Sequence, residues 1–210
     1  MISLEAYQKN PCGASSIPYW KAKSLTIPSN MKIVHSDVFD ETLLHHYADR
    51  RFFRFIHHLT NLPEHHAEGI KFEVIQSNRF DELADMINRS YAHCDIRVSA
   101  DEVRRLTTTP VYCPALWIGA MVDEKLIGSI ICDFDLEVGE AIIEWLQVLP
   151  AYRGRGIASA LISEALKTMS GFADFATVSG ECDNRTNPES VYRRCGFEGK
   201  DVWHILSKKA

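Results

Sequence analysis

Apolar and polar positions follow regular patterns along the chain from residue 71 onward. Short apolar runs bounded by turn residues predict strands at residues 71–76, 115–122, 125–134, 140–149, 174–181 and 197–208. Apolar residues at helical spacing predict helices at residues 78–92, 99–109, 156–169 and 187–195. Ser99 and Glu102 form a capping-box pattern at the start of the second helix. Strands and helices interspersed in this order indicate an α/β (α+β) domain with a mixed sheet.

Residues 1–70 have a less regular pattern than the rest of the chain. Three prolines and several small polar residues surround Tyr19 and Trp20, which predicts an irregular segment held by aromatic side chains. Residues 31–39 have a weak strand pattern, whereas residues 40–62 have apolar positions at helical spacing and predict a helix that ends before Pro63. We therefore expect a partly irregular, partly helical N-terminal extension over residues 1–70, followed by a domain over residues 71–210.

Composition and charge restrict the class of protein. The chain has 210 residues, of which 46% are hydrophobic and 24% charged, as is typical of a soluble globular protein. Its formal net charge of -5 argues against nucleic acid or an anionic membrane surface as the main partner. No apolar run approaches the roughly 20 residues that span a bilayer, and the first residues lack the layout of a signal peptide. We expect a cytoplasmic location.

Cysteine and histidine lack the spacing of a metal site. The six cysteines include no C-x-x-C pair, so we expect free thiols. Six of the nine histidines form adjacent pairs, and adjacent side chains on a helix or strand point in different directions. No H-E-x-x-H motif is present. We expect no metal, and we interpret the histidine pairs as polar residues on exposed helix faces.

The stretch WLQVLPAYRGRGIASALISEAL joins a predicted strand directly to a predicted helix. The first turn of a helix presents unpaired backbone N–H groups and the positive end of the helix dipole, so it binds anions. Gly154, Gly156 and Ala158 keep side-chain bulk away from these groups, and two neighbouring arginines add positive charge. The stretch therefore indicates a binding site for a phosphate-bearing cofactor.

Two common nucleotide-binding loops fit this stretch poorly. A P-loop requires Gly-Lys-Ser/Thr, which does not follow the loop. The dinucleotide fingerprint G-x-G-x-x-G/A would begin at Gly154 and would place Ser159 at its third glycine. It also expects the opening strand of a βαβ unit, whereas a predicted hairpin precedes this loop.

The pattern R-x-x-G-x-A at residues 153–158, together with NPESVYRRCGF at residues 187–197, resembles the GNAT superfamily of N-acyltransferases. The resemblance covers about two thirds of the chain and implies a mixed, mostly antiparallel central sheet flanked by helices. It further implies acetyl-coenzyme A as cosubstrate, with pantetheine along the last strand residues and the diphosphate at the loop. The cofactor-binding residues implied in this way are Leu146, Gln147, Val148, Arg153, Gly154, Arg155, Gly156, Ile157, Ala158 and Ser159. Neither Asn184 nor Asn187 matches the spacing of the family's leading asparagine, so neither is assigned a contact.

Two residues are candidates for acid–base catalysis, because an ammonium acceptor must lose a proton and a thiolate must leave. Glu144 interrupts an apolar strand and, by two-residue alternation, shares a face with Leu146 and Val148, so it is the candidate base. The alternative for Glu144 is a structural carboxylate paired with an arginine. The resemblance places Tyr192 near the thioester sulfur as the acid, and the alternative is an aromatic packed on the sheet. Cys195 is interpreted as a buried thiol and not as a nucleophile.

The sequence therefore predicts an N-acetyltransferase in which a primary amine attacks acetyl-coenzyme A directly. The alternative is a sensor or regulatory module that binds acyl-coenzyme A without turnover. The acceptor, a small-molecule or peptide amine, is expected near residues 88–109, where Tyr91, His93 and Trp117 either line the site or pack. The IPYWK segment of the extension either caps the acceptor cleft, forms an interface or covers a sheet edge. We expect a monomer or a homodimer.

Overall fold

A single eight-stranded sheet organises the chain in the computed structural model, which describes residues 2–92 and 96–209. The strand order is β1-β8-β2-β7-β6-β5-β4-β3, and all neighbours pair antiparallel except β6 and β7, which pair parallel. The strands are β1 (Met31–His35), β2 (Tyr47–His57), β3 (Lys71–Val74), β4 (Tyr112–Val122), β5 (Lys125–Asp135), β6 (Glu140–Val148), β7 (Phe175–Glu181) and β8 (Glu198–Lys208). The predicted mixed, mostly antiparallel sheet is therefore confirmed.

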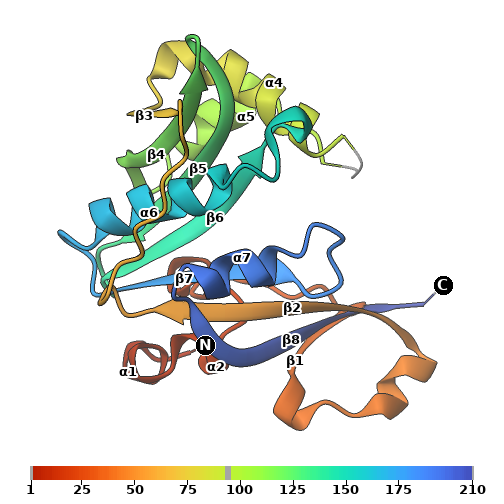
Figure 1. Ribbon diagram of the computed structural model, residues 1–210. Coiled ribbons are helices and arrows are strands. Elements are labelled where there is room, and N and C mark those ends of the chain that lie inside the picture. Colours follow the sequence, from red (N-terminus) through yellow and green to blue (C-terminus); the bar gives the residue numbers. More distant parts are fainter. Residues whose placement is uncertain (1, 93–95, 210) are drawn as a thin grey trace.

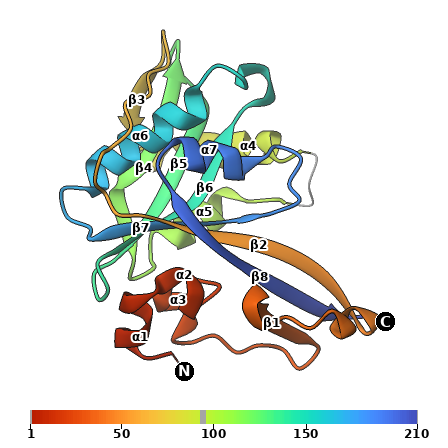
Figure 2. The same ribbon diagram turned by 60° about the horizontal axis from the view of Figure 1, so that its bottom comes forward.

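Helices cover both faces of this sheet. The α-helices are α1 (Leu4–Lys9), α2 (Pro11–Ala14), α3 (Tyr19–Ala22), α4 (Phe80–Ser90), α5 (Ala100–Leu106), α6 (Ile157–Met169) and α7 (Pro188–Arg194), and the 3₁₀ turns are η1 (Ser36–Val38), η2 (Glu41–His45), η3 (Ser77–Arg79) and η4 (Pro150–Tyr152). Helix α6 lies in front of strands β4, β5 and β6, and α4 and α5 lie behind them (Figure 1). Helices α1 and α2 lie on the opposite side of β2 and β8 from α7 (Figure 2).

The elements predicted beyond residue 71 are confirmed. Each predicted strand and helix is present with small shifts of its ends, and the Ser99–Glu102 capping box forms in both directions. Strands β4 and β5 are joined at Asp123 and Glu124, which both have positive φ angles (46° and 62°). Two such residues in succession match the tight turn that suits the right-handed twist of a hairpin.

The helix predicted for residues 40–62 is wrong. Only Glu41–His45 is helical, as a 3₁₀ turn, and Tyr47–His57 forms strand β2 between β7 and β8. Phe53, Arg54, Phe55 and His57 are all buried in this strand, which pairs with a neighbour on each side, so its burial does not follow a two-residue period. Its aromatic residues are typical of strands. The expectation that the paired histidines lie on exposed helix faces is wrong for His57. Its ring is buried in a strand, with its centroid 5.3 Å from that of the Phe197 ring. The weak strand pattern at residues 31–39 is confirmed by β1.

The N-terminal helices are attached to the sheet through a buried polar cluster. The guanidinium of Arg54 donates to Glu140 (2.9 Å) and to the Tyr7 hydroxyl (2.6 Å), and the Tyr7 hydroxyl donates to Glu140 (2.8 Å). Thr177 of β7 also donates to Glu140. Arg54 and Glu140 are 1% and 0% exposed, so each charge depends on the other for compensation. The cluster joins α1 to strands β2, β6 and β7.

We expect Arg54→Met to lower the free energy of unfolding by roughly 3–5 kcal/mol, because it leaves the Glu140 carboxylate buried without its counter-ion. Arg50→Met is the matched control, since Arg50 lies on the same strand but forms an exposed ion pair with Glu181. That change should cost less than about 1 kcal/mol. Urea denaturation of both variants measures the difference. Equal losses would show that the buried cluster does not hold the structure together.

Candidate active site

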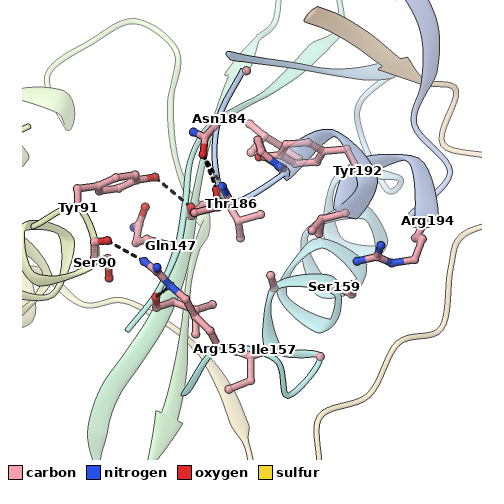
Figure 3. Close-up of a pocket in the computed structure, with 18 of the residues that line it drawn as sticks. Ser90, Tyr91, Gln147, Arg153, Ile157, Ser159, Asn184, Thr186, Tyr192 and Arg194 are labelled. Carbon is pink, nitrogen blue, oxygen red and sulfur yellow. Dashed lines mark hydrogen bonds between the residues drawn. The ribbon is translucent and has the colours of Figure 1, made fainter. Parts of the chain in front are cut away.

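Strands β6 and β7 pair over only four residues and then separate. Their parallel pairing runs from Glu140 opposite Phe175 to Ile143 opposite Val178, whereas β6 remains paired with β5 as far as Val148. A cavity of about 460 Å³ lies along this open side of β6, between the start of α6 and residues 179–194 (Figure 3). The size is within the range of small-molecule and cofactor sites.

The predicted cofactor-binding residues gather at this cavity. Nine of the ten line it, and these are Leu146, Gln147, Val148, Arg153, Gly154, Gly156, Ile157, Ala158 and Ser159. The tenth, Arg155, is not among the lining residues, and its guanidinium lies 5.2 Å from the centre of the Tyr152 ring. Both catalytic candidates, Glu144 and Tyr192, also line the cavity.

The loop before α6 adopts a backbone that requires glycine. Gly154 and Gly156 have φ angles of 77° and 76°, in the left-handed region that other residues rarely adopt. The first N–H that bonds back into the helix is that of Ala160, which donates to the Gly156 carbonyl (3.0 Å). No side chain of the described residues caps the helix at Gly156, so the preceding N–H groups are open to an anion.

The Arg153 side chain, which was expected to contact an anion, donates hydrogen bonds to two backbone carbonyls. Its Nε donates to the Val148 carbonyl (3.1 Å), and its Nη2 donates to the Ser90 carbonyl (2.7 Å), so it ties the end of β6 to the end of α4 (Figure 3). The Tyr91 hydroxyl donates to the Leu146 carbonyl (3.1 Å) on the same strand. Side chains thus satisfy two carbonyls of β6 in the segment that has no β7 partner.

Tyr192 of α7 packs on the sheet and also faces the cavity. Its ring packs against Phe53 and Phe197, with centroids 6.2 and 5.7 Å away, and it also lines the cavity. Burial raises the pKa of the Tyr192 phenol far above its ordinary value, so the group keeps its proton at every physiological pH. Asn187 caps α7 through the Ser190 N–H (3.4 Å), and only Asn184 lines the cavity.

Glu144 lies at a bulge of β6. Trp145 pairs with Ile131 and Ile143 pairs with Cys132, which leaves Glu144 as the extra residue and interrupts the two-residue alternation assumed for this strand. Glu144 accepts from the Lys21 ammonium (2.6 Å) of helix α3, so its ion-pair partner is a lysine and not the arginine of the alternative interpretation. Its side chain remains 21% exposed, at the rim of the cavity.

Asp133 is a buried carboxyl near this bulge that sequence reasoning missed. It lies on β5 opposite Ile142 of β6. Burial, with a smaller contribution from the Glu144 charge, raises the pKa of Asp133 to about 7, while Lys21 opposes the rise. An aspartate inside the apolar run SIICDF was the available signal, as was the glutamate inside EAIIEWLQV.

The residues expected near the acceptor do not all lie at the cavity. Tyr91 lines the large cavity, whereas Trp117 is buried in the core at 1% exposure and therefore packs. The Asn88 side chain bonds in both directions to the Val98 backbone (2.8 Å each). His93 lies outside the described residues. Five of the six cysteines are described, and these five are free thiols as predicted, with Cys195 buried.

The chain resembles known proteins in sequence and in fold. Residues 80–197 match the model of the acetyltransferase (GNAT) family, which is more than half of the chain. This chain is a member of the GNAT family. Members of the family are acetyltransferases that use acetyl-coenzyme A.

Individual members of the GNAT family resemble this chain over shorter stretches. A protein from Yersinia pestis (strain Pestoides F) named acetyltransferase is 31% identical over 101 residues, which are 48% of this chain and 67% of that protein. The Arabidopsis thaliana protein named N-alpha-acetyltransferase MAK3 is 34% identical over 96 residues, which are 43% of this chain and 50% of that protein. A GCN5-related N-acetyltransferase of Sphaerobacter thermophilus shares the fold, with a TM-score of 0.70, 19% identity and coverage of 86% of this chain and 61% of that chain.

Within residues 2–92 and 96–209, no helix has both the length and the apolar character needed to cross a bilayer. Over the same residues, no three or more His, Cys, Asp or Glu side chains cluster in a way that could hold a metal ion.

We expect Asp133 to make the stability of the protein depend on pH. Its pKa in the folded state lies above its ordinary value of 3.8, so the folded state binds this proton more tightly than the unfolded state. Stability from this source is complete below pH ~4 and falls as the pH rises to about 7. Between about pH 5 and pH 8, the free energy of unfolding should fall more in the wild type than in Asp133→Asn, by on the order of 2 kcal/mol. Urea denaturation across this range measures it, and parallel curves would contradict the assignment.

Proposed function

We propose that the protein transfers an acetyl group from acetyl-coenzyme A to a primary amine that attacks the thioester directly. One observation carries this proposal: a single cavity holds an uncapped helix start, an open strand segment, a carboxylate and a protonated phenol. Each of these four features serves a different part of the reaction, from binding of the diphosphate to departure of the thiol. Family membership supports the same donor.

The donor is proposed to lie along β6 with its diphosphate at the start of α6. The N–H groups of Ile157, Ala158 and Ser159 would bind the diphosphate oxygens, and the two left-handed glycines leave room for them. The buried Oε1 of Gln147 has no hydrogen-bond partner among the described residues and would accept from a pantetheine amide. Acetyl-coenzyme A supplies the acyl group as a thioester.

Glu144 and Tyr192 are proposed to move the two protons of the reaction. Glu144 accepts a proton from the ammonium of the acceptor, which frees the nitrogen lone pair for attack on the thioester carbon. The carbon–sulfur bond then breaks, and Tyr192 donates a proton to the departing thiolate. The second proton lost by the attacking nitrogen restores the phenol of Tyr192, and Glu144 releases the first proton to solvent. The raised pKa of Tyr192 keeps the phenol protonated at physiological pH, so its O–H can donate a hydrogen bond to the sulfur. No residue of the chain is acylated in this scheme.

A binding module without turnover is the second candidate, and the Lys21–Glu144 ion pair is the observation that favours it. In such a protein, the ion pair would be permanent and acetyl-coenzyme A would remain intact. Stabilisation by acetyl-coenzyme A, without release of coenzyme A in the presence of any amine, would support the binding module and contradict the transferase.

We expect Tyr192→Phe to lower kcat about 100-fold or more, because the thiolate then departs without its proton donor. The KM for acetyl-coenzyme A should change little, since the ring and its packing are retained. Release of coenzyme A thiol in a coupled colour assay measures both constants. Turnover equal to that of the wild type would remove Tyr192 from the mechanism.

We expect Gly154→Val to weaken coenzyme A binding at least about tenfold, because a branched side chain would occupy the approach to the α6 amides. Gly69→Val is the matched control: both glycines are exposed, have φ near +70°, and have open space where a Cβ would lie. The two variants therefore carry similar backbone strain. Calorimetric titration with coenzyme A should show the loss for Gly154→Val alone, and equal affinities would contradict this placement of the diphosphate.

A further inference from the structure

A second cavity of about 310 Å³ lies between residues 16–25 and the sheet. Its walls come from this N-terminal segment and from strands β1, β2, β6, β7 and β8. It shares three lining residues with the larger cavity, namely Ile143, Glu144 and Ser179. The two cavities therefore meet at the carboxylate proposed as the general base. Residues 16–25 lie outside the stretch that matches the family.

The second cavity is mainly apolar. Eight of its thirteen lining residues are apolar, and these are Ile17, Pro18, Leu25, Ile33, Phe52, Ile142, Ile143 and Ile205. Its cationic side chains already have partners, since Arg54 is paired with Glu140 (2.9 Å) and Lys21 with Glu144 (2.6 Å). An anionic ligand would therefore find no uncompensated charge there, whereas an apolar body would be buried favourably.

Lys21 shows where an ammonium fits in this cavity. Its Nζ lies 2.6 Å from Glu144 Oε1, at the junction of the two cavities, which is where the nitrogen of an acceptor must lose its proton. The Lys21 side chain is 36% exposed and forms part of the short helix α3 at the surface. Such a half-buried pair at the surface contributes on the order of 1 kcal/mol, so a ligand ammonium can displace it.

We propose that this second cavity is the acceptor site and that it takes a small primary amine on a mainly apolar body. This inference rests on the proposed function. The amine displaces Lys21 from Glu144 and enters the junction, while its apolar body lies between residues 16–25 and the sheet. A volume of about 310 Å³ is at the lower end for small-molecule sites, which favours a compact amine over a peptide.

The first experiment compares acceptors at saturating acetyl-coenzyme A. The probes are n-hexylamine, 2-phenylethylamine, glucosamine, spermidine and a short peptide with a free α-amine, with thiol release as the readout. We expect kcat/KM for the two apolar amines to exceed that for the other three by about tenfold or more. A preference for glucosamine, spermidine or the peptide would overturn the inference.

The second experiment tests the cavity with a matched pair of variants. Leu25 lines the cavity and Ile27 does not, yet both belong to the same segment and are 46% and 45% exposed. Leu25→Asp should raise the KM for n-hexylamine about tenfold without changing the KM for acetyl-coenzyme A, and Ile27→Asp should change neither by more than about twofold. Lys21→Met should lower the KM for the amine about two- to fivefold, because the competing ammonium is gone.

The outcomes separate the two proposals. If amines are acetylated but Leu25→Asp and Ile27→Asp behave alike, the acceptor lies elsewhere and the proposed function stands. If neither coenzyme A nor acetyl-coenzyme A raises the melting temperature and no amine releases thiol, the proposed function fails, and the acceptor site fails with it.

Discussion

The separation of strands β6 and β7 is the constraint on which the rest of the site depends. Parallel pairing stops at Ile143 and Val178, and both cavities have walls at this point. Continued pairing would close the side of β6 on which a cofactor can lie, and it would cover the Glu144 bulge. The separation costs backbone hydrogen bonds, and side chains offset part of that cost: Tyr91 donates to the Leu146 carbonyl and Arg153 to the Val148 carbonyl. Arg153, which its position in the loop marks as an anion-binding residue, therefore also stabilises the end of β6.

The first 60 residues contribute directly to this separated region. Strand β2 borders β7 on its far side, and the Arg54–Glu140–Tyr7 cluster holds α1 against the paired end of β6 and β7. Lys21 reaches the bulge from the same N-terminal part of the chain. The stretch that matches the GNAT family begins only at residue 80. Residues 16–25, which line the second cavity, therefore lie outside the matched stretch.

The sequence predicted the parts of the structure that depend on local patterns. The strand–loop–helix stretch, the hairpin and the Ser99 capping box each follow from spacing within about a dozen residues, and each is confirmed. Strand β2 was mispredicted because its pairing partners lie at residues 176–181 and 198–208, and no local pattern records such distant contacts. The bulge at Glu144, its ion pair with Lys21 and the burial of Asp133 beside it also depend on tertiary contacts. Sequence reasoning could therefore name Glu144 as a candidate but could not supply its partner.

A crystal structure with bound coenzyme A tests the central claim most directly. We predict that the diphosphate accepts hydrogen bonds from the backbone N–H groups at the start of α6, at about 2.7–3.2 Å. The pantetheine should run along residues 146–148, and the sulfur should lie between Tyr192 and the junction of the two cavities at Glu144. Coenzyme A bound elsewhere, or bound with its sulfur pointing away from Tyr192 and Glu144, would contradict the account.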